Sequence, residues 1–173
     1  MTDELTYSST GAMGTQLNIV TTVDVAGLLA GRATEDCVWL TDTSPLSVGK
    51  GSSSLATTCT QGQVINWLIL CLDTERRIDG SYPPIASVLS IVFLDGDSSM
   101  PSSFKVVDDL KTYGAPDRHI SRYTPVYSYW AGMVPSDAPL GDFRYRLNIE
   151  IPSPTGGMST IIEVAQPSLK IVG

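Results

Sequence analysis

The apolar run from Val64 to Leu72 constrains the fold of this chain more than any other stretch. Its nine residues include one polar side chain, Asn66. A surface helix would show an apolar stripe with a period of 3.6, and a half-exposed strand would alternate, whereas this run does neither. Its β-branched and aromatic residues favour a strand that is buried on both faces, although periodicity alone leaves a buried helix open. The rest of the chain is then expected to cover this strand from two sides.

The length of 173 residues predicts one domain, over residues 16–173, behind a polar leader at residues 1–15. The three cysteines are Cys37, Cys59 and Cys71. Their odd number, the absence of a CxxC motif and an N-terminus without a secretory signal predict reduced thiols in a cytoplasmic protein. A bridge between Cys59 and Cys71 is the less favoured alternative.

The charge balance excludes some classes of partner. Eleven Lys and Arg stand against 18 Asp and Glu, which gives a net charge of −7. Nucleic acids and anionic membranes require a cationic face, so we expect neither as the main partner. No apolar run approaches the roughly 20 residues of a membrane-spanning helix, so we expect no membrane span.

Short strands separated by turn residues are predicted along the whole chain. Residues 142–151 alternate most clearly, with Phe143, Tyr145 and Leu147 on one face, as in a half-buried antiparallel strand. Asp24 is a possible cap for a short helix or turn at residues 24–32. Further strands are predicted at residues 16–23, 37–41, 55–59, 86–94, 159–165 and 168–172.

Two segments leave alternatives open. Residues 106–110 suit a strand or a helical turn, and residues 118–134, which Pro125 divides, suit one bent strand or two strands. Eight to ten short strands with turn signals about every ten residues are typical of an all-β protein. The predicted fold is a single antiparallel β-sandwich, jelly-roll or Ig-like, with at most one short helix.

Catalytic motifs are poorly represented. A Ser-His-Asp triad would have to use His119, the only histidine, and a surface or strand-end position suits that residue better. The segment from Gly49 to Ser52 looks like a phosphate-binding loop, but Lys50 is followed by Gly51 instead of Ser or Thr. A flexible loop is the expected structure there. We therefore expect no enzyme activity and no obligatory cofactor.

Two sets of residues are candidates for ligand binding. Asp95 and Asp97 place carboxylates at alternate positions, as at the start of a calcium loop, but Val106 at the twelfth position excludes an EF-hand. Tyr127 and Trp130 suit a stacking platform for carbohydrate, against the alternative of cross-strand packing. A calcium-assisted carbohydrate site built from these four residues is one hypothesis, and a plain turn with core aromatics is the other.

The N-terminal half carries a series of segments that resembles a known family. The segments are LNIVTTVDVAGLLAG from Leu17, DCVWLTDTSPL from Asp36 and SSLATTCTQGQVINW from Ser53. They are similar to the bacterial AidA/PixA inclusion-body protein family, and the likeness continues through YWAGMV, DFRYRLNIEI and EVAQPSLKIV. Two positions depart from the family pattern: Ala131 stands where Glu is frequent, and Gln166 where Asp is usual.

The resemblance implies a small cytoplasmic protein, sometimes stored in inclusions, with no established enzymatic activity or cofactor. Storage, stress and host-interaction roles have been suggested for such proteins. The first functional hypothesis is therefore a non-enzymatic protein that acts by self-association, as a homo-oligomer or larger assembly. The alternative is the carbohydrate-binding module described above, in which case Trp130 should be exposed beside convergent polar groups.

Overall fold

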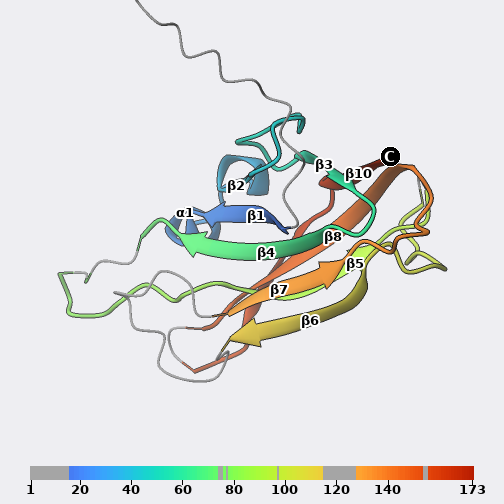
Figure 1. Cartoon of the computed structure of the whole chain (residues 1–173). Coiled ribbons are helices and arrows are strands. Elements are labelled where there is room, and N and C mark those ends of the chain that lie inside the picture. The colour runs from blue at the N-terminus through green and yellow to red at the C-terminus, as the bar shows by residue number, and fades with distance from the viewer. Residues whose placement is uncertain (1–15, 74–75, 77, 97, 115–127, 154–155) are drawn as a thin grey trace, which may run out of the picture.

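The structure is a computed structural model that describes residues 16–173 apart from 74–75, 77, 97, 115–127 and 154–155. These residues form ten strands, a five-residue α-helix and one 3-10 turn. The strands make two mixed sheets that face each other, and Figure 1 shows β8 and β10 passing behind the first sheet. The all-β prediction is confirmed, whereas the predicted leader at residues 1–15 and His119 lie outside the described residues.

The first sheet is built around the apolar run identified in the sequence. Its strand order is β2-β1-β4-β7-β6. Strands β1 and β4 run parallel along their whole length, from Gln16 opposite Val64 to Val23 opposite Cys71. The bounds are Gln16–Val23 for β1, Val38–Asp42 for β2, Val64–Cys71 for β4, Asp108–Gly114 for β6 and Ser128–Met133 for β7.

The second sheet is organised on one long strand, β8. Strand β5 follows one edge of β8, and β9 and then β10 follow the other edge. Strand β3 pairs with β10 in parallel, and among the described strands β9 pairs only with β8. The bounds are Ala56–Thr60 for β3, Ser87–Phe93 for β5, Gly141–Ile151 for β8, Thr160–Val164 for β9 and Ser168–Val172 for β10.

The purely antiparallel sandwich predicted from the sequence is wrong in this respect, because each sheet contains one parallel pair. Parallel neighbours require a crossover of a dozen or more residues. Between β1 and β4 that crossover contains the helix α1 (Val25–Leu29), the 3-10 turn η1 (Thr34–Asp36), β2 and β3. The periodicity of side chains locates most of the strands but carries no information on which distant strand becomes the neighbour of each.

The core lies between the two sheets. Trp67 is fully buried and makes edge-to-face contacts with Tyr145 and Phe93, at centroid distances of 6.0 and 6.4 Å. The strand prediction for the apolar run is confirmed, but its burial on both faces is wrong. Residues Val64, Leu68 and Leu70 are only partly buried, because the second sheet covers only the inward face of β4.

Three smaller predictions can be compared with the structure. Helix α1 (Val25–Leu29) begins after Asp24, whose carboxylate accepts a hydrogen bond of 2.9 Å from the Gly27 N–H, as an N-cap does. The ambiguous segment near residues 106–110 contributes to strand β6, not to a helical turn. All three cysteines are free thiols, so Cys59 and Cys71 form no bridge.

Candidate functional site

Asp95, the first of the two predicted calcium residues, lies just after the end of β5. Asp95 is exposed, and its backbone carbonyl accepts hydrogen bonds from the N–H (3.0 Å) and the hydroxyl (2.7 Å) of Ser98, which close a tight turn. Asp97 lies outside the described residues. Within the part of the chain that the structure describes, no three His, Cys, Asp or Glu side chains are grouped so that they could hold a metal ion.

Of the two residues of the predicted aromatic platform, Tyr127 and Trp130, the structure describes only Trp130. Trp130 lies in β7 opposite Trp67, packs against the core, and donates its indole N–H to the Val88 carbonyl at 2.9 Å. Tyr127 lies outside the described residues. Val88 and Asp95 are at opposite ends of β5, about 20 Å apart at the rise of a strand. The structure therefore does not bring Trp130 and Asp95 together, and the carbohydrate-binding alternative stays a prediction.

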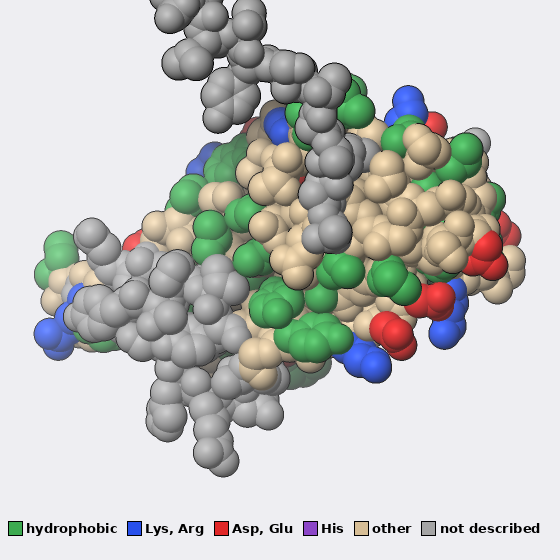
Figure 2. All heavy atoms as spheres, in the orientation of Figure 1, with side chains coloured by type: hydrophobic (Ala, Val, Ile, Leu, Met, Phe, Trp, Pro, Cys, Tyr) green, Lys and Arg blue, Asp and Glu red, His purple; other side chains and the backbone are tan. Residues whose placement is uncertain are grey.

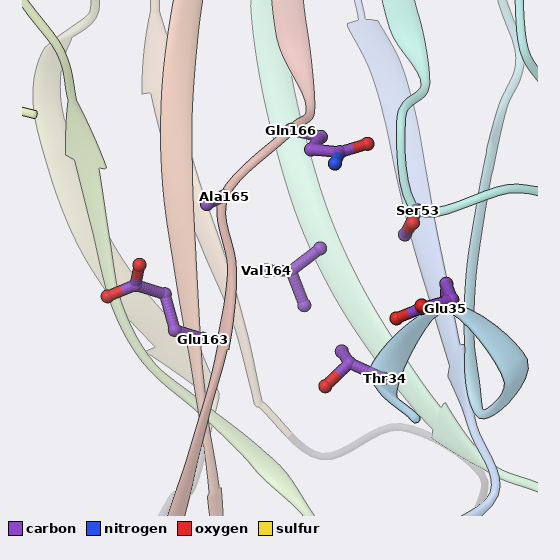
Figure 3. A pocket seen from close by; sticks show the side chains of 7 residues that line it. All are labelled: Thr34, Glu35, Ser53, Glu163, Val164, Ala165 and Gln166. Carbon is purple, nitrogen blue, oxygen red and sulfur yellow. The ribbon is translucent and has the colours of Figure 1, made fainter. Parts of the chain in front are cut away.

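A pocket of about 500 Å³ opens beside β9, where the edges of the two sheets meet. One wall is the end of β9 and the segment that follows it, and the other wall is η1 (Thr34–Asp36) with the loop before β3. Figure 3 shows Val164 and Gln166 pointing across the pocket toward the opposite wall, whereas Glu163 and Ala165 point away. The lining residues are Thr34, Glu35, Ser53, Glu163, Val164, Ala165 and Gln166.

The charge in this pocket comes from one carboxylate. Glu163 is engaged on the outer face of the sheet, where Arg146 donates to it at 3.2 Å. Glu35 is exposed, extends toward the pocket, and has no ion-pair partner among the placed residues. The lining includes no Lys or Arg. The pocket therefore presents a single uncompensated negative charge beside the hydroxyl groups of Thr34 and Ser53.

Sequence reasoning missed this pocket. The only local signal was the break at Gln166-Pro167 between two predicted strands, because Glu35 and Ser53 are distant in sequence and carry no motif. Gln166 was noted only as a departure from the pattern of a resembling family.

The outward face of the first sheet is the second surface of interest, and we call it the uncharged face. None of the residues of β1, β4 and β7 carries a charge. At its centre the Asn66 amide donates to the Asn18 side-chain carbonyl at 2.8 Å. In Figure 2 uncharged side chains occupy the middle of this face, and charged ones lie toward its rim. The outward residues include Asn18, Val20, Thr22, Asn66, Leu68, Leu70, Tyr129 and Met133.

The thiols are unsuited to nucleophilic chemistry. Burial raises the pKa of the Cys59 thiol to about 12, and the neighbouring Asp42 carboxylate adds to the shift. Burial also raises the pKa of Cys71, whose sulfur accepts the Ala86 N–H at 3.2 Å. The thiolate is the reactive form of cysteine, so these two residues are expected to be inert in the folded protein.

Comparison with known proteins bears on the fold. A family model described as a domain of unknown function (DUF8788) matches residues 15–81, which span β1 to β4. The chain is also similar to the crystal structure of the inclusion body protein PixA from Burkholderia cenocepacia J2315, with a TM-score of 0.56 over 90% of each chain. The chain has the fold of PixA.

The sequence identity to PixA is only 7%, so the likeness confirms the predicted AidA/PixA resemblance as a shared fold. A comparison with curated protein sequences gives no match. None of the described helices has the length and hydropathy needed to cross a membrane.

Proposed function

We propose that this protein is non-enzymatic and acts by self-association, through contact between the uncharged faces of the first sheet. The observation that carries the proposal is the absence of any charged residue from β1, β4 and β7, in a chain whose net charge is −7. Two copies of such an acidic protein repel each other, and carboxylates brought into an interface would be desolvated at a high cost. A face without charges avoids both penalties.

The dimensions of this face suit a reversible contact. Eight residues at about 3.3 Å each and three strands about 4.8 Å apart give roughly 400 Å² per copy. Two copies would then bury about 800 Å² in total, which is in the range of weak and transient protein–protein contacts. Association that depends on high protein concentration is the expected consequence.

Two further observations support the assembly proposal. The solved protein of the same fold is described as an inclusion body protein, and assembly at high concentration in the cytoplasm would be a related behaviour for this chain. The indole N–H of Trp130 donates to the Val88 carbonyl. It is therefore less available for a ligand than the carbohydrate-binding hypothesis required. Neither observation points to catalysis.

Sedimentation velocity over a wide range of concentration tests the proposal. The native chain should shift from monomer to larger species as the concentration rises, whereas Leu70→Lys, which places a charge on the uncharged face, should remain monomeric. Ile161→Lys is the matched control, since Ile161 is an exposed strand residue (59%) on the outward side of the other sheet. Melting temperatures would show that both variants fold. A native chain that stays monomeric throughout, or a Leu70→Lys variant that still associates, would exclude this interface.

A further inference from the structure

Among the residues that the structure describes, no strand pairs with the outer edge of β9, whereas β3 pairs with the outer edge of its neighbour β10. Strands β9 and β10 follow each other along β8, and β3 pairs with β10 from Ser168 opposite Ala56 to Val172 opposite Thr60. In the described part of the chain β9 pairs with β8 alone. A strand added beside β9 would continue the line of β3.

A bulge marks the boundary between the open and the covered part. Val164 lies opposite Leu147 and Ser168 opposite Arg144, so three residues, 165–167, face the two residues 145–146. The backbone of Ala165 and Gln166 has no hydrogen-bond partner among the residues placed here, whereas the Ser168 N–H donates to the Leu55 carbonyl at 3.0 Å. Bulges are frequent next to binding sites, because they end pairing and redirect the strand.

The pocket lies beside this open backbone. Its volume of about 500 Å³ falls within the range of sites that hold ligands, and its lining combines the edge of β9 with Thr34, Glu35 and Ser53 on the opposite wall. A strand that pairs with β9 would place alternate side chains toward that wall. Because Glu35 supplies the only uncompensated charge there, a cationic side chain is favoured and an anionic one is disfavoured.

We infer that this pocket binds an extended peptide segment of a partner protein, which pairs through its backbone with β9 and places a lysine or arginine beside Glu35. Edge pairing of this kind takes its affinity from main-chain hydrogen bonds and its specificity from pockets for alternate side chains. This surface lies on the second sheet, apart from the uncharged face, so the inference does not depend on self-association.

A phage-displayed library of random heptapeptides, selected on the intact chain, tests the inference. Selected peptides should share a Lys or Arg flanked by β-branched residues, and a synthetic copy should bind in fluorescence anisotropy. Glu35→Gln should weaken that binding about tenfold, the equivalent of roughly 1.4 kcal/mol for a lost charge contact. Glu150→Gln, which removes a carboxylate from the outward side of β8, should leave it unchanged.

Two changes to the backbone separate edge pairing from simple charge attraction. Ala165→Pro removes a backbone N–H that has no partner among the placed residues, so the variant should keep the native melting temperature and lose the peptide. Methylation of alternate peptide nitrogens should also abolish binding, because it removes donors without altering side chains.

The opposite results would overturn the inference. One is that selection on the native chain enriches no peptide beyond those that selection on the Ala165→Pro variant also enriches. The other is a selected peptide whose binding is unchanged both by Glu35→Gln in the protein and by methylation of the peptide backbone. A change in oligomeric mass caused by Ala165→Pro would assign the edge to a second copy of this chain, and would equally overturn a peptide partner.

Discussion

At the scale of single residues, the best-defined polar feature is the contact between Lys50 and Asp42. The Asp42 side chain is fully buried, and its Oδ1 atom lies 3.1 Å from the Lys50 ammonium. The same ammonium donates to the backbone carbonyls of Asp42 (2.9 Å) and Ser44 (2.6 Å). Lys50, which in the sequence resembled the lysine of a phosphate-binding loop, thus holds the loop before β3 against the end of β2.

Lys50→Ala should destabilise the protein by about 2–4 kcal/mol, because it leaves a buried carboxylate without its cation. The lower end of this range reflects the 37% exposure of the Lys50 side chain. Lys111→Ala is a matched control, since its ion pair with Asp109 joins two exposed side chains and should contribute under about 1 kcal/mol. Urea unfolding measures both variants. Equal losses would show that Asp42 does not depend on Lys50.

At the scale of elements, β6 and β7 meet through a glycine. A Cβ atom added to Gly132 would lie 2.8 Å from the Asp108 carbonyl oxygen and in conflict with Val107. Opposite Gly132, β6 contains a register shift between Asp108 and Lys111, and Asp109 has a positive φ of 52°. The irregular edge strand therefore approaches β7 closely only because residue 132 has no side chain.

Gly132→Ala should lower the free energy of unfolding by about 1–3 kcal/mol, the usual cost of inserting a methyl group into a packed site. The loss should be accompanied by faster amide exchange in β6. Gly157→Ala should change stability little, because its new methyl group would lie 3.4 Å from Ser153 Oγ, an ordinary van der Waals contact. Should the two substitutions prove equivalent, the close approach of β6 to β7 would not be stabilising.

At the scale of the whole molecule, the core between the sheets contains weakly acidic groups. Burial raises the pKa of Cys59 from 9.0 to about 12 and raises that of the Tyr145 hydroxyl as well. Well below pH 9 both groups are protonated in the folded and the unfolded chain, so there neither affects the pH dependence of stability. Above pH 9 the unfolded chain releases protons that the folded chain retains, which favours unfolding.

The free energy of unfolding should therefore fall by about 1–3 kcal/mol per buried group between pH 9 and roughly pH 11. Urea titrations at a series of alkaline pH values measure this slope. Cys59→Ala should remove the thiol contribution and flatten the decline, while well below pH 9 the slopes of variant and native chain should coincide. An unchanged alkaline slope in Cys59→Ala would contradict the assignment.

Strand positions were largely predictable, because alternation is a local property. Strand β1 has the predicted bounds, and in β8 the inward set from Tyr145 to Ile151 is the buried one. The central run was predicted as a strand, but its outward residues Leu68 and Leu70 were expected to be covered. Composition cannot distinguish a strand that lies between two layers from a strand that is covered on one face only.

The sequence by itself determined the all-β class, the strand segments, the Asp24 cap and the lack of charge in β1, β4 and β7, since each depends on neighbours within a few residues. Only the tertiary structure decided that β1 and β4 are parallel, that β9 pairs with β8 alone among the described strands, and that Glu35, Ser53 and Gln166 line one pocket. The physical reason is that these features depend on which distant segments become neighbours. That choice follows from packing the whole core, and no short stretch of sequence encodes it.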